Sequence, residues 1–144
     1  MRRGVRIALA AGMLGLAAVA LAAGLAAGGT PAAAPVGTRT VPVGIHFSRF
    51  EPSTIAVEPG ETVRFVIRNA DPIDHEFILG DATVQAIHER GTEAVHPPRP
   101  GEVSVPAGET VETTYTFGDT GALTFACHLP GHFAYGMLGT VRVG

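Results

Sequence analysis

The sequence predicts an all-β domain, an antiparallel Greek-key β-sandwich with a short helical or irregular insertion near residues 81–100. Apolar and polar residues alternate with a period of two over several short stretches, which is the pattern of half-buried strands. Gly and Pro separate these stretches at frequent intervals, as turns require. A single stretch favours a helix. About seven short strands with almost no helix are typical of a sandwich of two sheets.

Seven stretches show the alternation, and each places its apolar residues on one face. The turn signal Glu58-Pro59-Gly60 separates the second stretch from the third, and Asp71-Pro72 separates the third from the fourth. The inward residues of the seven strands form the candidate core. In chain order they are Val41, Val43, Ile45 and Phe47; Ile55 and Val57; Val63, Phe65 and Ile67; His75, Phe77 and Leu79; Val111, Thr113, Tyr115 and Phe117; Leu123, Phe125 and Cys127; and the closing stretch Thr140–Val143.

The segment between the fourth and fifth of these strands breaks the alternation. Asp81–Arg90 favours a helix with Val84 and Ile87 on one side. Residues 91–101 are rich in Pro, and we expect them to run over the surface.

The N-terminal segment predicts export. Arg2, Arg3 and Arg6 precede the uncharged apolar stretch Ile7–Gly29, the pattern of a secretory signal. About 20 apolar residues also suffice to cross a bilayer, so residues 1–29 are a signal peptide or an N-terminal membrane anchor. Residues 30–39, rich in Pro, Ala and Gly, form a flexible linker. Residues 40–144 make one domain, which either alternative places outside the cytoplasm: in the periplasm, in the cell envelope or secreted.

The charge and the sulfur content of the chain limit the classes of function that it can have. From residue 39 onward there are thirteen acidic and seven basic residues, a formal charge of −6, and the chain has no lysine. This balance argues against a nucleic-acid partner, and we expect a monomer. Cys127 is the only cysteine, so it forms no disulfide within the chain and is either buried, paired with another molecule or a metal ligand.

One loop carries a metal-binding pattern. Cys127, His132 and Met137 recur at steps of five, and Leu129–His132 has Pro and Gly in the central positions of a turn that would return His132 over Cys127. His75, on an apolar strand face, is the natural fourth ligand. One thiolate, two imidazoles and a weak axial thioether form the ligand set of a blue-copper site. The sequence therefore predicts one copper ion that alternates between Cu(I) and Cu(II).

These residues resemble those of the cupredoxins, the blue type 1 copper proteins that include plastocyanin and azurin. Residues 62–80 are similar to the family's first-histidine strand pair, and residues 127–139 are similar to its C-terminal ligand loop. The resemblance covers residues 40–144 and implies a two-sheet Greek-key sandwich. Glu76 departs from it, because plastocyanin and azurin carry at this place an asparagine that braces the ligand loop. Asn69 and backbone donors are the candidates to replace that brace.

The loop also resembles the type 1 copper loop of multicopper oxidases. There a His-Cys-His triplet leads to a trinuclear copper cluster, whereas Ala126 precedes Cys127 here and the chain has no His-x-His pair. An oxygen-reducing oxidase is thus excluded, and we expect no enzyme activity. The leading hypothesis is a one-electron carrier, and the alternative is an extracytoplasmic protein that sequesters or delivers copper.

The resemblance also predicts where partners dock. An exposed apolar patch around His132 would receive redox partner proteins of the cell envelope. Its candidate members are Leu129, Pro130, Phe133 and Leu138.

The remaining histidines are assigned to the surface. His128 should point away from the metal by strand alternation and lie at the surface, and His46 should be solvated. His88 and His96 flank the insertion, with Glu89 and Glu93 between them. We expect a solvated loop there, with a weak second metal site as the alternative.

Overall fold

The computed structural model describes residues 37–91 and 97–144. The predicted signal or anchor segment, most of the predicted linker, and the loop with Glu93 and His96 lie outside the described residues, so these predictions stay untested. No helix in the described part of the chain has the length and apolar character that a bilayer crossing requires.

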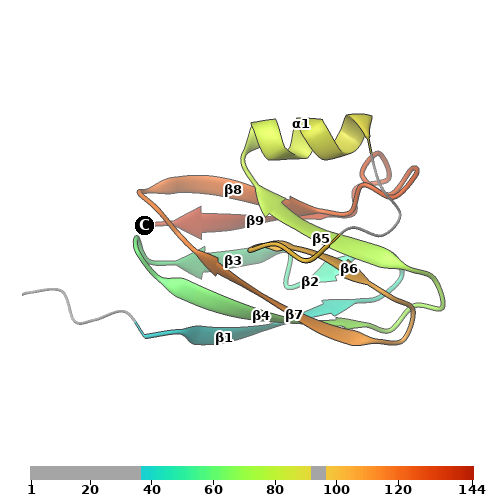
Figure 1. Cartoon of the computed structure of the whole chain (residues 1–144), viewed down its shortest axis with the longest axis horizontal. Helices are drawn as coiled ribbons and strands as arrows, with labels where there is room; N and C mark the ends of the chain where they lie inside the picture. The colour runs from blue at the N-terminus through green and yellow to red at the C-terminus, as the bar shows by residue number, and fades with distance from the viewer. Residues whose placement is uncertain (1–36, 92–96) are drawn as a thin grey trace, which may run out of the picture. The chain divides into compact units, whose positions relative to one another are not determined.

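Two sheets and one helix make up the described domain (Figure 1). One sheet has the strand order β2-β1-β4-β7, and the other has the order β3-β9-β8-β5-β6. The elements are β1 (Arg39–Ile45), β2 (Phe50–Glu51), β3 (Thr54–Val57), β4 (Thr62–Asn69), β5 (His75–Gly80), α1 (Ala82–Arg90), β6 (Glu102–Val105), β7 (Thr110–Thr116), β8 (Gly121–Ala126) and β9 (Leu138–Val143).

The core lies between the sheets and is rich in phenylalanine. Phe65 of β4 faces Phe77 of β5 across the two sheets, with ring centroids 5.3 Å apart. Phe77 in turn stacks on Phe125 of β8 at 5.2 Å. All three rings are fully buried, and burial of each stabilises the fold by about 1.5–3 kcal/mol. The predicted β-sandwich is confirmed.

The direction of the strands differs from the prediction in part. Five of the seven pairings are antiparallel, but β1 lies parallel to β4 and β3 lies parallel to β9. A period of two shows which face of a strand is buried, and it carries no information on which strand lies beside it or in which direction. Both sheets are therefore mixed.

Phe47 was wrongly assigned to the core. Strand β1 ends at Ile45, and Phe47 and Ser48 adopt left-handed conformations with φ of 51° and 52°. This turn directs Phe47 outward, where 81% of it is exposed.

Two strands were missed, β2 and β6. Strand β6 carries the expected alternation, since Val103 and Val105 are buried between Gly101 and Pro106. Strand β2 has two residues, which are too few to show a period.

The predicted helix is confirmed, although its buried face was misjudged. The Asp81 side chain caps the helix by accepting hydrogen bonds from the amides of Thr83 and Val84. Ile87 is 54% exposed, whereas Gln85 is buried and donates to the carbonyls of Ile78 and Thr124. Helix α1 thus covers the outer face of β5 and β8 (Figure 1).

Candidate metal centre

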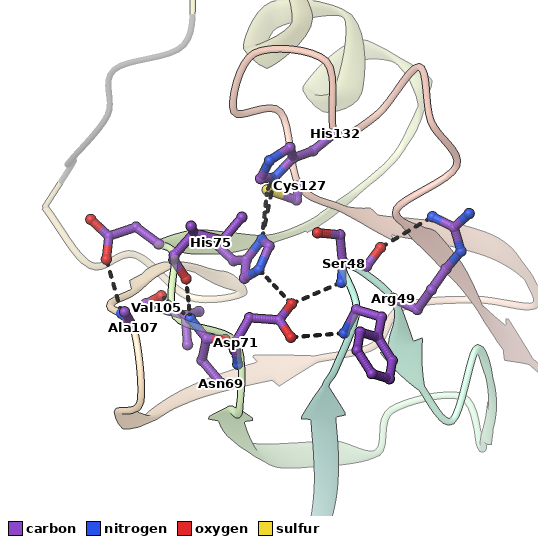
Figure 2. A network of polar contacts seen from close by, with 12 residues as sticks. Ser48, Arg49, Asn69, Asp71, His75, Val105, Ala107, Cys127 and His132 are labelled. Carbon is purple, nitrogen blue, oxygen red and sulfur yellow. Dashed lines mark hydrogen bonds and ion pairs between the residues drawn. The ribbon is translucent and has the colours of Figure 1, made fainter.

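Three predicted ligands converge at one end of the sandwich (Figure 2). His75 begins β5 and Cys127 directly follows β8, and these two strands are antiparallel neighbours, so both residues lie at the same sheet end. The sulfur of Cys127 lies 3.2 Å from Nδ1 of His132 and 4.0 Å from Nδ1 of His75. The two Nδ1 atoms are 3.2 Å apart. One thiol and two imidazole nitrogens thus face a common point.

The ligand loop is folded back on itself as the spacing predicts. The amide of His132 donates to the Leu129 carbonyl at 2.9 Å, which closes the predicted turn. Gly131 at its third position has φ of 86°, a left-handed conformation that glycine adopts without steric cost. The amide of Cys127 donates to the Met137 carbonyl at 3.1 Å, and the amide of Met137 donates to the His132 carbonyl at 3.0 Å. The three loop residues are therefore tied together by their backbones.

Met137 is fully buried and belongs to the same apolar cluster as Cys127. Its place beside both loop ligands agrees with the predicted role of a thioether donor. That its sulfur is an axial ligand stays a prediction.

Burial sets the protonation of the donors. It raises the pKa of the Cys127 thiol to about 11, against the opposing effect of backbone hydrogen bonds from Glu76 and Leu129. The thiol is therefore protonated at neutral pH, and a metal must displace its proton. Burial and the neighbouring His75 lower the pKa of His132. His132 is thus neutral at neutral pH, as a metal ligand must be.

His75 has a carboxylate partner that the sequence analysis did not identify. Its Nε2 lies 3.0 Å from Oδ2 of Asp71, and both side chains are buried. Burial alone would raise the pKa of Asp71, but hydrogen bonds from the amides of Ser48 and Phe47 and from His75 outweigh it and lower the pKa. Asp71 is therefore ionised. In the sequence Asp71-Pro72 is a turn signal, and no periodic pattern marks Asp71 as a partner of His75.

Glu76 occupies the place of the bracing asparagine and contacts the ligand loop itself. Its Oε1 accepts a hydrogen bond from the amide of His128 at 2.7 Å. Asn69, a predicted substitute for that brace, instead donates to the carbonyls of Ile73 and Val105. Glu76 therefore contacts the ligand loop in place of the asparagine, and Asn69 does not take this role.

The prediction of a surface position for His128 is wrong. The residue is buried, with Nε2 at 2.7 Å from Gln85 Oε1 and Nδ1 at 2.8 Å from Glu89 Oε2. Its ring also stacks on Phe133 at 4.8 Å. Helix α1 covers the sheet face that alternation would have left to solvent. His128 therefore faces the helix, and its contacts with Gln85 and Glu89 join the helix to the ligand loop.

The other described histidines do not form a second metal centre. His46 is exposed, as predicted. His88 is half-buried, with Nδ1 at 3.0 Å from the Val84 carbonyl and Nε2 at 3.7 Å from Glu102. Among residues 37–91 and 97–144, three His, Cys, Asp or Glu side chains lie close enough to share a metal only at His75, Cys127 and His132. His96 lies outside these residues.

The predicted apolar patch around His132 is exposed in part. Leu138 is 41% exposed and Pro130 is exposed, while Leu129 and Phe133 are half-buried. Tyr135, which the sequence analysis did not include, is 77% exposed.

Comparison with known proteins agrees with this site. The chain is similar to the copper-resistant cuproprotein CopI of Rubrivivax gelatinosus, with 42% identity over 80% of this chain and 72% of that protein. It is 32% identical to the CopI of Pseudomonas aeruginosa over 80% of this chain and 81% of that protein. Its fold is similar to that of auracyanin A, a "blue" copper protein from Chloroflexus aurantiacus, with a TM-score of 0.60 and 22% identity over 75% of this chain and 100% of that one.

The sequence match extends over nearly all of the described domain. Residues 41–144 match the copper-binding proteins of the plastocyanin/azurin family. The donor set of one thiol and two imidazoles fits the same metal, because sulfur ligands suit Cu(I) and imidazole suits both oxidation states. Copper is thus the cofactor, and the chain belongs to the plastocyanin/azurin family of copper-binding proteins.

Proposed function

We propose that this chain is an extracytoplasmic copper-handling protein, which sequesters or delivers one copper ion held by His75, Cys127, His132 and Met137. One observation supports the copper site above all. The Cys127 sulfur and the Nδ1 atoms of His75 and His132 all lie within 4.8 Å of one another. The name of the two relatives, copper-resistant cuproprotein, supports copper handling over the electron transfer that the sequence alone favours.

The site residues suit the capture of copper. Cys127 supplies a thiolate once it has released its proton, and the two histidines supply neutral imidazoles. Met137 would add a weak axial thioether, which modifies the preference for one oxidation state more than it holds the metal. Cys127, His75 and Met137 are buried, so water does not compete for three of the four positions.

An electron carrier is the second candidate, and the exposed part of the loop favours it. His132 is half-buried, and Leu138 and Tyr135 beside it in the loop are exposed. Redox partners of the cell envelope would dock on this apolar surface, since encounters of this kind use small interfaces. The formal charge of −6 from residue 39 onward would steer basic partners toward the protein at low salt. Neither function requires catalysis, and we expect a monomer in both cases.

The site assignment is tested with Cys127→Ser. The copper-loaded wild type should bind one copper and show an intense visible band from thiolate-to-copper charge transfer. Cys127→Ser should lose the band, while circular dichroism shows an unchanged fold because serine is close in size. A variant that stayed coloured would refute the assignment.

Stopped-flow measurements separate the two functions. Copper release to a chelator and electron exchange with a small redox protein are compared for the wild type, Leu138→Glu and the control Ala122→Glu. Ala122 is exposed and lies five residues before Cys127 along β8, so the control adds the same charge toward the other end of that strand. A delivery protein should release copper rapidly and a sequestering protein slowly, and in both cases electron exchange should be slow in all three proteins. Slow release, with rapid exchange that Leu138→Glu alone impairs, would establish the electron carrier instead.

A further inference from the structure

We propose that Asp71 is a positioning residue of the copper site, which fixes the orientation and tautomer of His75 and thereby favours oxidised copper. The inference rests on the proposed role of His75 as a ligand. It assigns a function to the polar network around Asp71, which Figure 2 shows below His75, Cys127 and His132.

The contact between Asp71 and His75 determines which nitrogen is available to copper. Both carboxyl oxygens of Asp71 accept hydrogen bonds from backbone amides. Asp71 is thus placed as an acceptor, and the hydrogen of the imidazole lies on Nε2, 3.0 Å from Oδ2. Nδ1 then carries the lone pair, and it is Nδ1 that lies near the Cys127 sulfur and His132. The His75 side chain is fully buried and that of Asp71 is 7% exposed, so water does not compete with this bond.

The carboxylate is itself held in place by a turn of unusual conformation. The amides of Phe47 and Ser48 donate to Oδ1 and Oδ2 of Asp71 at 2.7 and 2.8 Å. Both residues have left-handed φ values, which cost on the order of 1 kcal/mol each for residues other than glycine. In return, two consecutive amides point at one carboxylate, an arrangement that binds anions. The Asp71 amide also donates to Asn69 Oδ1 at 2.9 Å.

This arrangement has an electronic consequence beyond positioning. A carboxylate that accepts the hydrogen of an imidazole makes the other ring nitrogen a stronger donor. A stronger donor, together with the nearby negative charge, stabilises Cu(II) more than Cu(I). If Asp71 only closed the turn at residues 46–49, its replacement would alter stability but would leave the balance between the two oxidation states unchanged. The two roles therefore differ in a measurable quantity.

Asp71→Asn tests the inference, because the amide keeps the size of the side chain but loses the charge and one acceptor. The affinities of the protein for Cu(II) and Cu(I) are measured by chelator competition, and the reduction potential is measured on the copper-loaded protein. We expect the Cu(II) affinity to fall about tenfold or more and the Cu(I) affinity to change less. A tenfold change in their ratio raises the potential of a one-electron couple by about 59 mV.

Asp74→Asn is the matched control. Asp74 is an exposed carboxylate on the same loop, and it accepts a hydrogen bond from the Ala107 amide at 2.9 Å. The control removes the same charge three residues away from Asp71 and leaves the Asp71–His75 contact in place. A rise in potential for Asp71→Asn and not for Asp74→Asn supports the inference. Equal potentials for Asp71→Asn and wild type, or equal shifts in the two variants, would overturn it.

A measurement on the copper-free wild type keeps the inference testable even if Asp71→Asn does not fold. Nitrogen-15 NMR of the His75 ring should show the hydrogen on Nε2, and a hydrogen on Nδ1 would overturn the inference. Failure of the wild type to bind copper would refute the proposed function instead. The NMR result would still report on the contact between Asp71 and His75.

Discussion

Gly139→Ala should destabilise the domain through a single close approach. Gly139 of β9 is the register partner of Phe125 of β8, and a Cβ atom at position 139 would lie 2.1 Å from Cζ of that ring. Ordinary contact begins at 3.4 Å. The ring cannot withdraw easily, because Phe77 stacks on it at 5.2 Å and Phe50 meets it at 5.3 Å. The added methyl group must therefore displace either the ring or the strand.

Overpacking of this kind costs about 1–3 kcal/mol, and each kcal/mol lowers the Tm of a domain of this size by about 4–8 °C. Urea and thermal unfolding of the copper-free protein measure the change. The control is Gly118→Ala, since a Cβ atom there would have nothing within 4 Å. The double variant Gly139→Ala with Phe125→Leu should lose less stability than the two single changes together, because the smaller side chain relieves the clash. A wild-type Tm for Gly139→Ala, or strictly additive effects, would refute this reasoning.

Three further predictions concern the metal ligands and the charges. Met137→Leu should keep copper, raise the reduction potential and change the stability of the copper-free protein by less than about 1.5 kcal/mol; loss of all copper would show that Met137 is a principal ligand. The hydrogen bond from Arg39 lowers the pKa of Glu61, so its stabilisation is present above the ordinary value of 4.5 and lost as the pH falls through the lower folded value. Glu61→Gln should cost about 1–2 kcal/mol at pH 7 and flatten the acid side of a urea-unfolding pH series. Since the Cys127 pKa is raised to about 11, copper binding should release one proton and weaken about tenfold for each unit of decrease in pH between pH 9 and 7, as chelator competition would show.

Local patterns predicted the strands well where the period was long enough to see. Val63, Phe65 and Ile67 alternate over eight residues of β4, and all three are fully buried. The two residues of β2 offer no period. The parallel pairing of β1 with β4 depends on contacts between segments far apart in the sequence, to which a local pattern is blind.

The residues of the metal site likewise fall into those that a local pattern predicts and those that it does not. Cys127, His132 and Met137 come from one loop, so their spacing alone suggested a shared metal. His128 and Asp71 were misjudged or missed because their partners lie in other elements. Helix α1 covers His128, and the turn at residues 46–49 holds Asp71. Spacing thus predicted the candidate ligands, whereas the contacts of His128 and Asp71 with other elements became visible only in three dimensions.

The distribution of burial among the four proposed ligands bears on how either function would operate. His75, Cys127 and Met137 are buried, and His132 is the half-buried one. A copper acceptor and an electron acceptor would therefore approach the same surface of the loop. They differ in what the ligands must do, since an electron can leave with all of them in place, whereas copper cannot. Departure of copper returns a proton to Cys127, whose pKa is raised to about 11 by burial. A copper acceptor must therefore displace the metal while a proton reaches the thiol, whereas an electron acceptor needs no proton transfer at Cys127.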